Sequence, residues 1–251
     1  MDTSALPRNR APAGNTATTW LKIIALVFMF IDHAGKMLFP GIPEMRILGR
    51  IAFPIYAWCV IVGFHYTRSV PKYLLRILTV GLISQPLYMI SLNHTWSQPN
   101  VFLTIFLGLC SLWGIREKKY LSQFWAPAAA VILAIQLGAD YGWKGVVLFI
   151  MLYAVRDSRT GIAAVMISYF LFWGSFYSVT KSLFGFPIDL STLPSFLSQP
   201  LTAFMRMETY AILALPFILT RFKKDLKLPR WTGYLLYPAH LLVLYVLEQI
   251  L

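Results

Sequence analysis

Long apolar runs separated by short polar segments dominate the chain. A bilayer core needs about 20 consecutive apolar residues per helix, and fewer suffice where a helix is short or half-buried. Unpaired backbone groups are too costly in lipid for any spanning structure other than helices or a closed barrel. The pattern therefore predicts an all-α, polytopic helical membrane protein with about nine transmembrane helices. The candidate spans are residues 20–39, 51–69, 72–92, 99–115, 122–138, 142–155, 160–179, 198–220 and 232–251.

The polar segments predict the domain organisation. Residues 1–19 are polar and contain Pro7, Pro12 and Gly14, which is typical of a flexible cytoplasmic tail. The apolar run after them exceeds the core of a signal peptide, about 7–15 residues, so we expect an uncleaved first span. The longest connection covers only about residues 180–197. Residues 20–251 are therefore predicted to form a single transmembrane domain.

Composition excludes an ordinary water-soluble enzyme. Hydrophobic residues make up 58% of the chain and charged residues 13%, whereas soluble domains carry about 25% charged residues. The net charge of +12 is not arranged as a basic stripe on a soluble face, so no nucleic-acid partner is expected. The excess positive charge is better explained by loops on the cytoplasmic side of a membrane.

Lysine and arginine residues in the loops predict the orientation. The outside segments hold only Arg46, Arg50 and Lys181 if the amino terminus is inside. Because cytoplasmic loops carry the excess of positive charge, this asymmetry predicts an odd number of spans, with the amino terminus inside and the carboxyl terminus outside. The inside segments then hold Arg8, Arg10, Arg68, Lys72, Arg116, Lys118, Lys119, Arg156, Arg159, Arg221, Lys223, Lys224, Lys227 and Arg230.

Ionisable residues inside the spans predict a buried polar pocket. Such residues are costly in lipid and usually face a cavity or a partner. The predicted topology places several of them in the outer half of the bundle, together with Arg50, Asn100, Asp140 and Tyr141 at the outer starts of other spans. The residues within spans are Asp32, His33, Lys36, Arg76, Lys144, Arg206, Glu208 and His240.

The first span contains adjacent polar residues. Neighbouring residues on a helix do not face each other, whereas residues four apart do. Asp32 is therefore better placed to meet Lys36 than to orient His33, and we expect His33 to face the pocket. The chain contains neither HExxH nor CxxC, so no metal site is predicted.

Several short motifs, in this order and spacing, resemble the TraX family of bacterial membrane proteins. The resemblance covers nearly the whole chain from Trp20 to Leu251 and depends on the combination of motifs. They are Leu21-Lys22-Ile23-Ile24-Ala25 with Ile31-Asp32-His33, Gly49-Arg50-Ile51-Ala52-Phe53-Pro54-Ile55-Tyr56, Ser84-Gln85-Pro86, Asn100-Val101-Phe102-Leu103-Thr104, Asp140-Tyr141-Gly142-Trp143-Lys144-Gly145 and Tyr237-Pro238-Ala239-His240-Leu241.

The resemblance implies an enzyme of pilin modification in conjugation. The best-understood member of the family acetylates the amino-terminal residue of conjugative pilin. The family is similar to transmembrane acyltransferases, which pass acyl groups from cytoplasmic coenzyme A to acceptors across the membrane. By matching motifs, His33 would be the catalytic histidine, with Arg50, Asn100, Asp140 and His240 as supporting polar residues. A multi-pass position in the bacterial inner (plasma) membrane follows.

These residues suit acyl transfer, which needs a base, donors for the developing oxyanion and a shielded site. We expect acetyl-CoA as the acyl donor and His33, with Asp32 and His240, as the catalytic group. An acyl-histidine intermediate is the alternative to direct transfer. The acceptor is a peptide amine or another amine or hydroxyl. The predicted substrate-binding residues are Arg50, Asn100, Asp140, Tyr141, Lys144, Arg206 and Glu208.

Two rival functions are compatible with the same residues. A proton-coupled secondary transporter would use the buried ionisable groups as a relay, although no inverted repeat is visible. A non-catalytic component of an envelope complex would use them only as structural links between helices. Arg206 and Glu208 are the residues that best fit such a structural network, and Arg50 also fits an arginine that reaches the outer lipid headgroups.

Overall fold

The computed structural model describes residues 11–227, 229 and 232–251. Almost all regular structure in this part of the chain is helical. A short antiparallel hairpin pairs β1 (Ser182–Leu183) with β2 (Phe186–Pro187). The helices are α1 (Thr18–Met37), α2 (Pro43–Gly49), α3 (Ala52–Tyr66), α4 (Val70–Leu92), α5 (Val101–Glu117), the 3₁₀ turn η1 (Lys119–Leu121), α6 (Ser122–Gln136), α7 (Gly142–Ala154), α8 (Arg159–Gly174), α9 (Ser195–Phe204), the 3₁₀ helix η2 (Met207–Ala214), α10 (Leu215–Leu219) and α11 (Thr232–Ile250).

Local sequence signals explain several helix ends. Asn100 precedes α5, and its side chain accepts a hydrogen bond from the backbone N–H of Phe102 at 3.1 Å. Ser158 caps α8 in the same way, accepting from the N–H of Gly161 at 3.0 Å. Both are preferred N-cap residues because their side-chain oxygens satisfy otherwise unpaired N–H groups. At its other end, α4 stops at Asn93, which adopts a left-handed conformation that asparagine tolerates well.

The chain is an all-α membrane protein. Three helical segments of the described chain are long and apolar enough to cross a membrane, namely α1, α4 and the segment Pro43–Tyr66 that joins α2 to α3. Shorter apolar helices cover Gly142–Ala154, Met207–Leu219 and Leu235–Ile250. Peripheral helices expose large apolar side chains, among them Leu82 and Ile83 on α4 and Phe124 on α6. Such a surface suits contact with lipid.

One predicted span is wrong as a continuous helix. The run 198–220 is divided into α9, η2 and α10. Arg206 has an extended backbone between α9 and η2, and it forms a β-bridge with Val179. This pairing diverts the backbone N–H and C=O groups that a continuous helix would use. Each of the other eight predicted runs contains one helix, α1, α3 to α8 or α11, whereas α2 lies between the first two runs.

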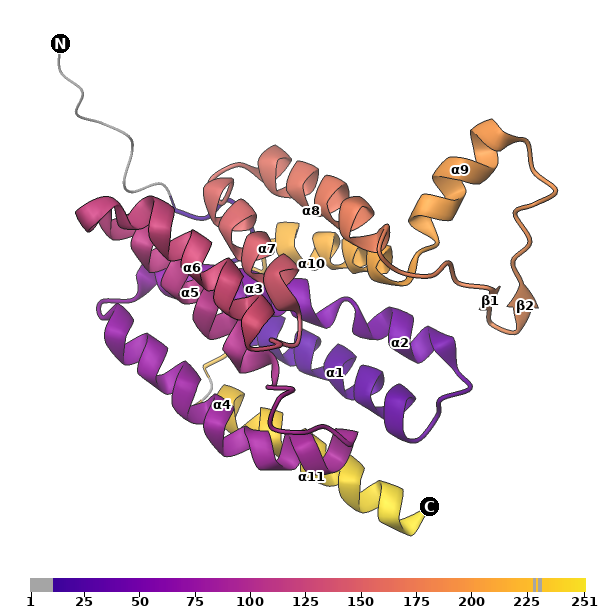
Figure 1. Cartoon of the computed structure of the whole chain (residues 1–251), viewed down its shortest axis with the longest axis horizontal. Helices are drawn as coiled ribbons and strands as arrows, with labels where there is room; N and C mark the ends of the chain where they lie inside the picture. Colours follow the sequence, from indigo (N-terminus) through magenta and orange to yellow (C-terminus); the bar gives the residue numbers. More distant parts are fainter. Residues whose placement is uncertain (1–10, 228, 230–231) are drawn as a thin grey trace.

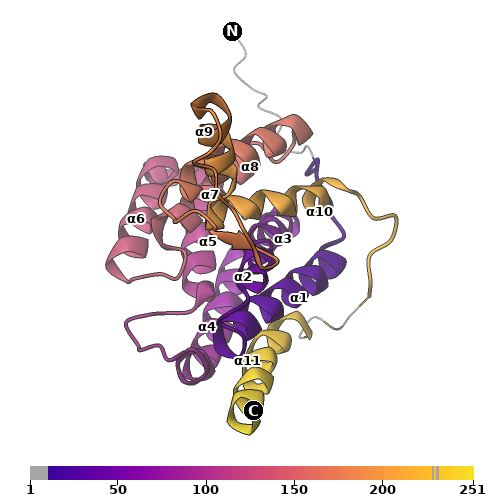
Figure 2. The same ribbon diagram turned by 90° about the vertical axis from the view of Figure 1, so that its right-hand side faces the viewer.

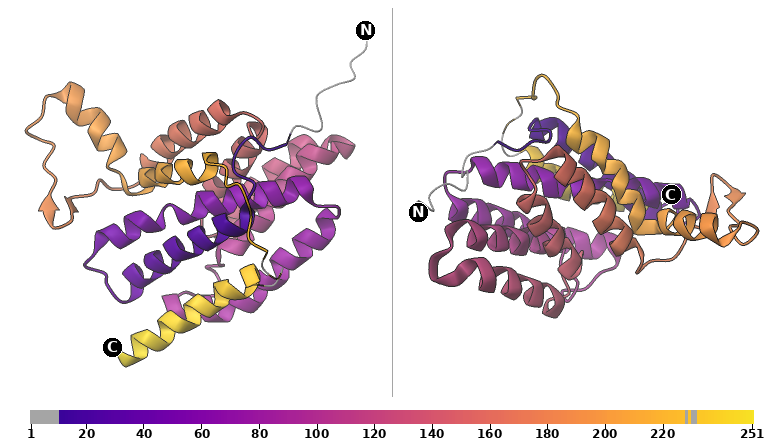
Figure 3. Two further views of the ribbon diagram at one scale, coloured as in Figure 1. Left: turned by 180° about the vertical axis from the view of Figure 1, so that it is seen from behind. Right: turned by 90° about the horizontal axis from the view of Figure 1, so that it is seen from above.

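Helix α3 forms the centre of the bundle. Figure 2 shows it surrounded by the other helices, and most of its side chains are buried. Trp58, which is fully buried, donates through Nε1 to the backbone oxygen of Asn15 at 2.8 Å. Helix α11 packs beside α1 and α4, as the left view of Figure 3 shows. These three helices, together with α3, α5 and the turn before α7, line the site described below.

The amino-terminal segment corrects part of the predicted tail. Residues 1–10, with Arg8 and Arg10, lie outside the described residues, as does Arg230. In residues 11–17 the chain packs against the bundle: Asn15 is buried, and its N–H donates to the backbone oxygen of Ile218 at 2.6 Å. The N–H of Ala13 donates to the oxygen of Arg156 at 2.7 Å. The packed domain therefore begins before Trp20, because backbone hydrogen bonds secure this segment.

Candidate functional site

Asp32 forms the centre of a buried ion-pair cluster. Its two carboxylate oxygens each accept from a different arginine, Arg46 and Arg50, both at 2.7 Å. Arg50 also bonds to Glu208 of η2 at 3.3 Å. Arg46 and Arg50 are four residues apart at the end of α2 and therefore point to the same side. Gly49 lies between them against Asp32, where a Cβ atom would overlap the carboxylate.

The cluster corrects the expected pairing of Asp32 with Lys36. The Nζ atom of Lys36 instead lies 2.9 Å from Nε2 of His94, in the connection between α4 and α5. The ring of His94 stacks on that of Tyr88, with centroids 4.9 Å apart. Helical spacing allowed the Asp32–Lys36 contact, but two arginines from α2 compete for Asp32 and each can direct a planar donor group at it.

His33 and His240 form a hydrogen-bonded pair across α1 and α11. Nδ1 of His33 lies 2.9 Å from Nε2 of His240, and Nδ1 of His240 lies 3.2 Å from the backbone oxygen of Leu236. A carbonyl oxygen only accepts, so Nδ1 of neutral His240 carries the proton and its Nε2 accepts from His33. His33 is then protonated at Nδ1. Its Nε2 keeps a lone pair and has no hydrogen-bond partner among the described residues.

An elongated cavity of about 330 Å³ reaches this histidine. At one end it is lined by Thr19, Lys22 and Arg76, and at the other by Asp32, His33, Asp140 and Tyr141. Lys22 and His33 are eleven positions apart on α1, which corresponds to about 16 Å of helix. The wall between the two ends is mostly apolar and includes Leu26, Met29, Phe53, Val60, Ile77, Phe102 and Ile105.

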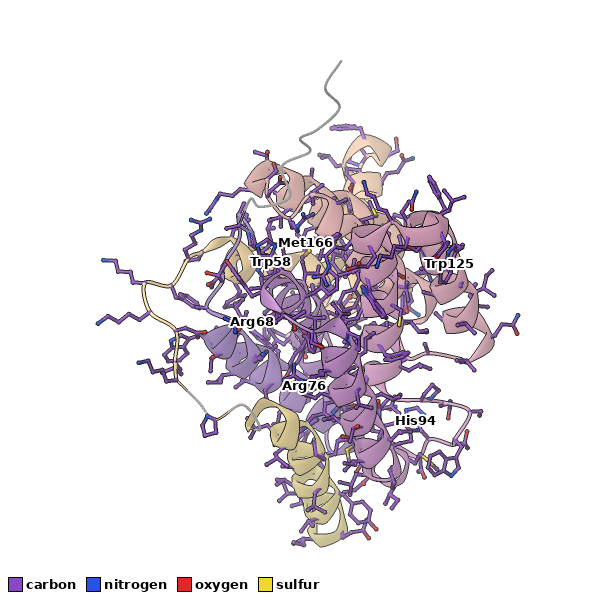
Figure 4. All side chains as sticks on the ribbon, turned by 90° about the vertical axis from the view of Figure 1, so that its left-hand side faces the viewer. Trp58, Arg68, Arg76, His94, Trp125 and Met166 are labelled. Atoms are coloured by element: carbon purple, nitrogen blue, oxygen red, sulfur yellow. The ribbon has the colours of Figure 1, made fainter. Side chains whose placement is uncertain are left out.

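The Lys22 end of the cavity is cationic. Figure 4 looks onto this end of the bundle and shows Arg68 and Arg76 near its centre, with Trp125 at the periphery. Lys22 is exposed, and Arg76 is half-buried with its guanidinium 5.5 Å from the ring centroid of Tyr73. The Nε atom of Arg76 is buried and lacks a hydrogen-bond partner within the described chain. An anionic group entering here would satisfy it.

A tight turn presents Asp140 and Tyr141 to the other end. Gly138 and Gly142 flank it with φ values of +60° and +54°, a region that glycine enters without steric cost. The N–H of Gly142 donates to the oxygen of Ala139 at 2.6 Å. Tyr141 stacks on Phe53 with ring centroids 3.7 Å apart. Burial raises the pKa of Asp140 to about 6, and Arg50 and Lys36 partly offset that rise.

The remaining predicted residues lie elsewhere. Asn100 uses its side chain as the cap of α5 and as a donor to Gly81 at 2.8 Å, and it lines a second, smaller pocket. Lys144 places Nζ 4.1 Å from the ring centroid of Phe176. Arg206 donates to the backbone oxygens of Ser175 and Tyr177 at 3.0 and 2.8 Å. None of the three lines the cavity.

The predicted site residues thus fall into two groups. Four line the cavity: Asp32, His33, Asp140 and Tyr141. The other three do not line it but bond to residues nearby: Arg50 to Asp32, Glu208 to Arg50 and His240 to His33. Arg46 and Lys22 were not among the residues predicted for the site. For Arg46, the available signal was its position four residues before Arg50.

In the part of the chain that the structure describes, no three His, Cys, Asp or Glu side chains could hold a metal ion.

Comparison with known proteins identifies relatives of this chain. A protein of Rickettsia prowazekii (strain Madrid E), described as uncharacterized, is 29% identical over 147 residues, which are 57% of each chain. The probable fimbrial assembly protein FimC, serogroup H1, of Dichelobacter nodosus is 27% identical over 157 residues, which are 56% of this chain and 64% of the relative. The similarity therefore spans less than two thirds of either relative. No solved structure matches the chain.

The match to a protein family is more extensive. The family described as "TraX protein" matches residues 17–248, from the residue before α1 almost to the end of α11. The matched region includes both histidines, the Asp32 cluster and all of the residues that line the cavity. The chain belongs to the TraX family.

Proposed function

We propose that the protein is an integral membrane acyltransferase that moves an acetyl group from acetyl-CoA to an amine of a peptide acceptor similar to pilin. The observation that carries this proposal is the cavity between a cationic end and the unbonded Nε2 of His33. The fimbrial assembly protein among the relatives and membership of the TraX family favour a pilin-like acceptor.

The shape and charge of the cavity suit an acyl-coenzyme A donor. Its phosphates would lie near Lys22 and Arg76, where the buried Nε of Arg76 lacks a partner within the described residues. The pantetheine arm would follow the apolar wall along α1. The thioester would then reach His33, about 16 Å along the helix from Lys22. A negatively charged, elongated ligand with an apolar arm therefore matches each part of the site.

The histidine pair supplies the proton transfer. Nε2 of His33 accepts a proton from the acceptor nitrogen as that nitrogen forms a bond to the thioester carbonyl carbon. The carbon–sulfur bond then breaks, and the proton on His33 passes to the departing coenzyme A sulfur. His240 holds His33 in the required tautomer, since its own Nδ1–H is committed to Leu236. The same Nε2 lone pair would form the bond in a covalent acyl-histidine route.

The charge cluster contributes positioning. Both terminal nitrogens of Arg50 are bonded to carboxylates, so Arg50 acts by fixing Asp32 and by its positive charge near the thioester oxygen. The side chain of Asn100, a predicted substrate-binding residue, is committed to the start of α5 and to Gly81. Positive charge held rigidly beside a developing oxyanion lowers the barrier to acyl transfer.

We further propose about nine crossings of the bacterial inner membrane, with the amino terminus cytoplasmic and the carboxyl terminus outside. Figure 1 supports this orientation: the basic α3–α4 and α5–α6 connections lie at one end, and the α1–α2 connection, α9 and the carboxyl terminus lie toward the other. The cationic end of the cavity would then face the cytoplasm, where acetyl-CoA is available.

The test uses purified protein in lipid nanodiscs with acetyl-CoA. Binding is followed by thermal shift and thiol release by a chromogenic reagent, for the wild type and for His33→Ala. His65→Ala is the matched control, because His65 lies outside the cavity at the end of α3. We expect both variants to bind acetyl-CoA and only His33→Ala to lose thiol release. A folded, fully active His33→Ala protein would refute the proposal, and a wild type that does not bind acetyl-CoA would favour transport or a scaffold.

A further inference from the structure

Asp140 differs from the other carboxylates at its end of the cavity. Asp32 is bonded to two arginines and Glu208 to one. The carboxylate of Asp140 interacts with the hydroxyl of Tyr88. No described Lys, Arg or His side chain forms an ion pair with it. It is therefore an acidic group in the wall of the cavity that can still form an ion pair with a cation.

The position of Asp140 makes that capacity available to a ligand. Asp140 is exposed, and it lines the same cavity as His33. The turn between Gly138 and Gly142 fixes its backbone, and Tyr141 is held by stacking on Phe53. The carboxylate is thus presented by a turn that is closed by a hydrogen bond from the N–H of Gly142 to the oxygen of Ala139.

Lys36 is the cation that could have neutralised Asp140. The two residues are close enough for their charges to affect each other. Yet Nζ of Lys36 lies 2.9 Å from His94 and forms no ion pair with Asp140. Arg50, the other nearby cation, is occupied by Asp32 and Glu208. The charges around Asp140 therefore leave its carboxylate for another positive group.

We propose that Asp140 binds the acceptor as its ammonium, which loses one proton to solvent before the nitrogen attacks the thioester, and that the site thereby selects primary amines over hydroxyls. This inference rests on the proposed acyl transfer, because it identifies the acceptor side of the same cavity. An ammonium group offers three donors and a positive charge, whereas an alcohol offers one donor and no charge. A carboxylate without a cationic partner discriminates between them through a charge-assisted hydrogen bond.

The environment of Asp140 adds support. Desolvation is the main cause that raises its pKa to about 6, with Asp32 and Glu208 acting in the same direction and Arg50 and Lys36 against them. At neutral pH the group is therefore mostly ionised, and neighbouring protein atoms replace part of its solvation. A bound ammonium would provide the interaction that solvent would otherwise supply.

The experiment compares two isosteric probes, alanyl-alanine amide and lactyl-alanine amide, which differ only in an ammonium or a hydroxyl at the first residue. KM is measured with acetyl-CoA, and binding is measured by calorimetry on the inactive His33→Ala protein loaded with coenzyme A. For Asp140→Asn we expect KM and Kd of the amine probe to rise about tenfold or more, as for loss of a charged hydrogen bond. The KM of acetyl-CoA should not change, and Asp140→Glu should retain the preference for the amine.

Lys36→Met is the control for a purely structural role. If Asp140 served only to balance Lys36, this variant would reproduce the effect of Asp140→Asn, and the inference would be overturned. An unchanged amine Kd in a folded Asp140→Asn protein, or no amine binding by the wild type, would also overturn it. If the wild type released no thiol but bound the amine through Asp140, the acyltransferase proposal would fail while the ammonium site remained.

Discussion

The two ends of the cavity use charge in opposite ways. At the His33 end, Asp32 and Glu208 are buried, and each is bonded to Arg50. At the other end, Lys22 is exposed, and neither Lys22 nor Arg76 pairs with a carboxylate of the described chain. Mutually satisfied charges fix geometry, whereas unsatisfied charges are free to bind a ligand. The contrast separates residues that hold the site from residues that receive substrate.

The largest effect is expected from breaking the buried cluster. Asp32→Ala leaves Arg50 and Arg46 without their shared carboxylate in a poorly solvated position. Removing one partner of such a pair costs about 3–5 kcal/mol. Thermal or denaturant unfolding in nanodiscs measures the loss. The control is Glu117→Ala, which removes the half-exposed pair with Arg116 and should cost below about 1 kcal/mol. Equal losses in the two variants would contradict the contrast.

His240→Ala should affect rate more than stability. Without Nε2 of His240, nothing holds the proton of His33 on Nδ1, and Nε2 of His33 is no longer reliably the free base. We expect thiol release to fall about a hundredfold, within the range for acid–base assistance. The KM of acetyl-CoA should stay near the wild-type value, because His240 does not line the cavity. A His240→Ala protein with a normal rate and a normal pH profile would exclude the tautomer role.

The sequence predicted the fold more completely than it predicted the site. Apolar runs located most helices because a membrane span is a local property of composition. The run 198–220 misled because its break depends on a β-bridge between Arg206 and Val179, which are distant in sequence. The packing of Asn15 against Trp58 was likewise invisible, since no local pattern distinguishes a polar tail from a segment that binds the bundle.

In the site, too, local sequence signals were informative, whereas contacts between distant residues could not be predicted. His33, Asp32 and His240 were predicted as site residues because ionisable groups inside spans require partners. Their actual partners could not be chosen from spacing: Asp32 bonds to two arginines of α2 instead of Lys36, and Lys36 bonds to His94. Asn100 was predicted to bind substrate, yet its side chain caps α5. Helical spacing states which residues can meet on one helix, and only the packing of several helices decides which of them do.

The cationic end supplies a prediction of intermediate size. Lys22→Gln combined with Arg76→Gln should raise the KM of acetyl-CoA about tenfold, since each loses a charged hydrogen bond near solvent. The maximal rate should be preserved. The change should be absent with acetyl-pantetheine, which lacks the adenosine phosphates, and should shrink at high salt. Lys72→Gln is the control, because Lys72 is exposed at the start of α4 and does not line the cavity. Equal effects on both donors would place the phosphates elsewhere.

The smallest effect concerns Asp140. It tests whether this carboxylate belongs with the paired charges or with those left to bind a ligand. Burial raises the pKa of Asp140 from 3.8 to about 6, so the folded protein binds this proton more tightly than the unfolded chain. Stability without substrate should therefore rise as the pH falls from 7 to 5, by less than about 1 kcal/mol because solvent screens the accessible part of the side chain. The Asp140→Asn protein should lose this rise in stability, whereas the Glu117→Ala protein should keep it.

With the amine probe bound, the rise in stability at lower pH should weaken or reverse, since the ammonium requires the ionised carboxylate. A wild-type increment that Asp140→Asn retains in full would mean that another group titrates, and Asp140 would then belong with the paired charges that hold the site.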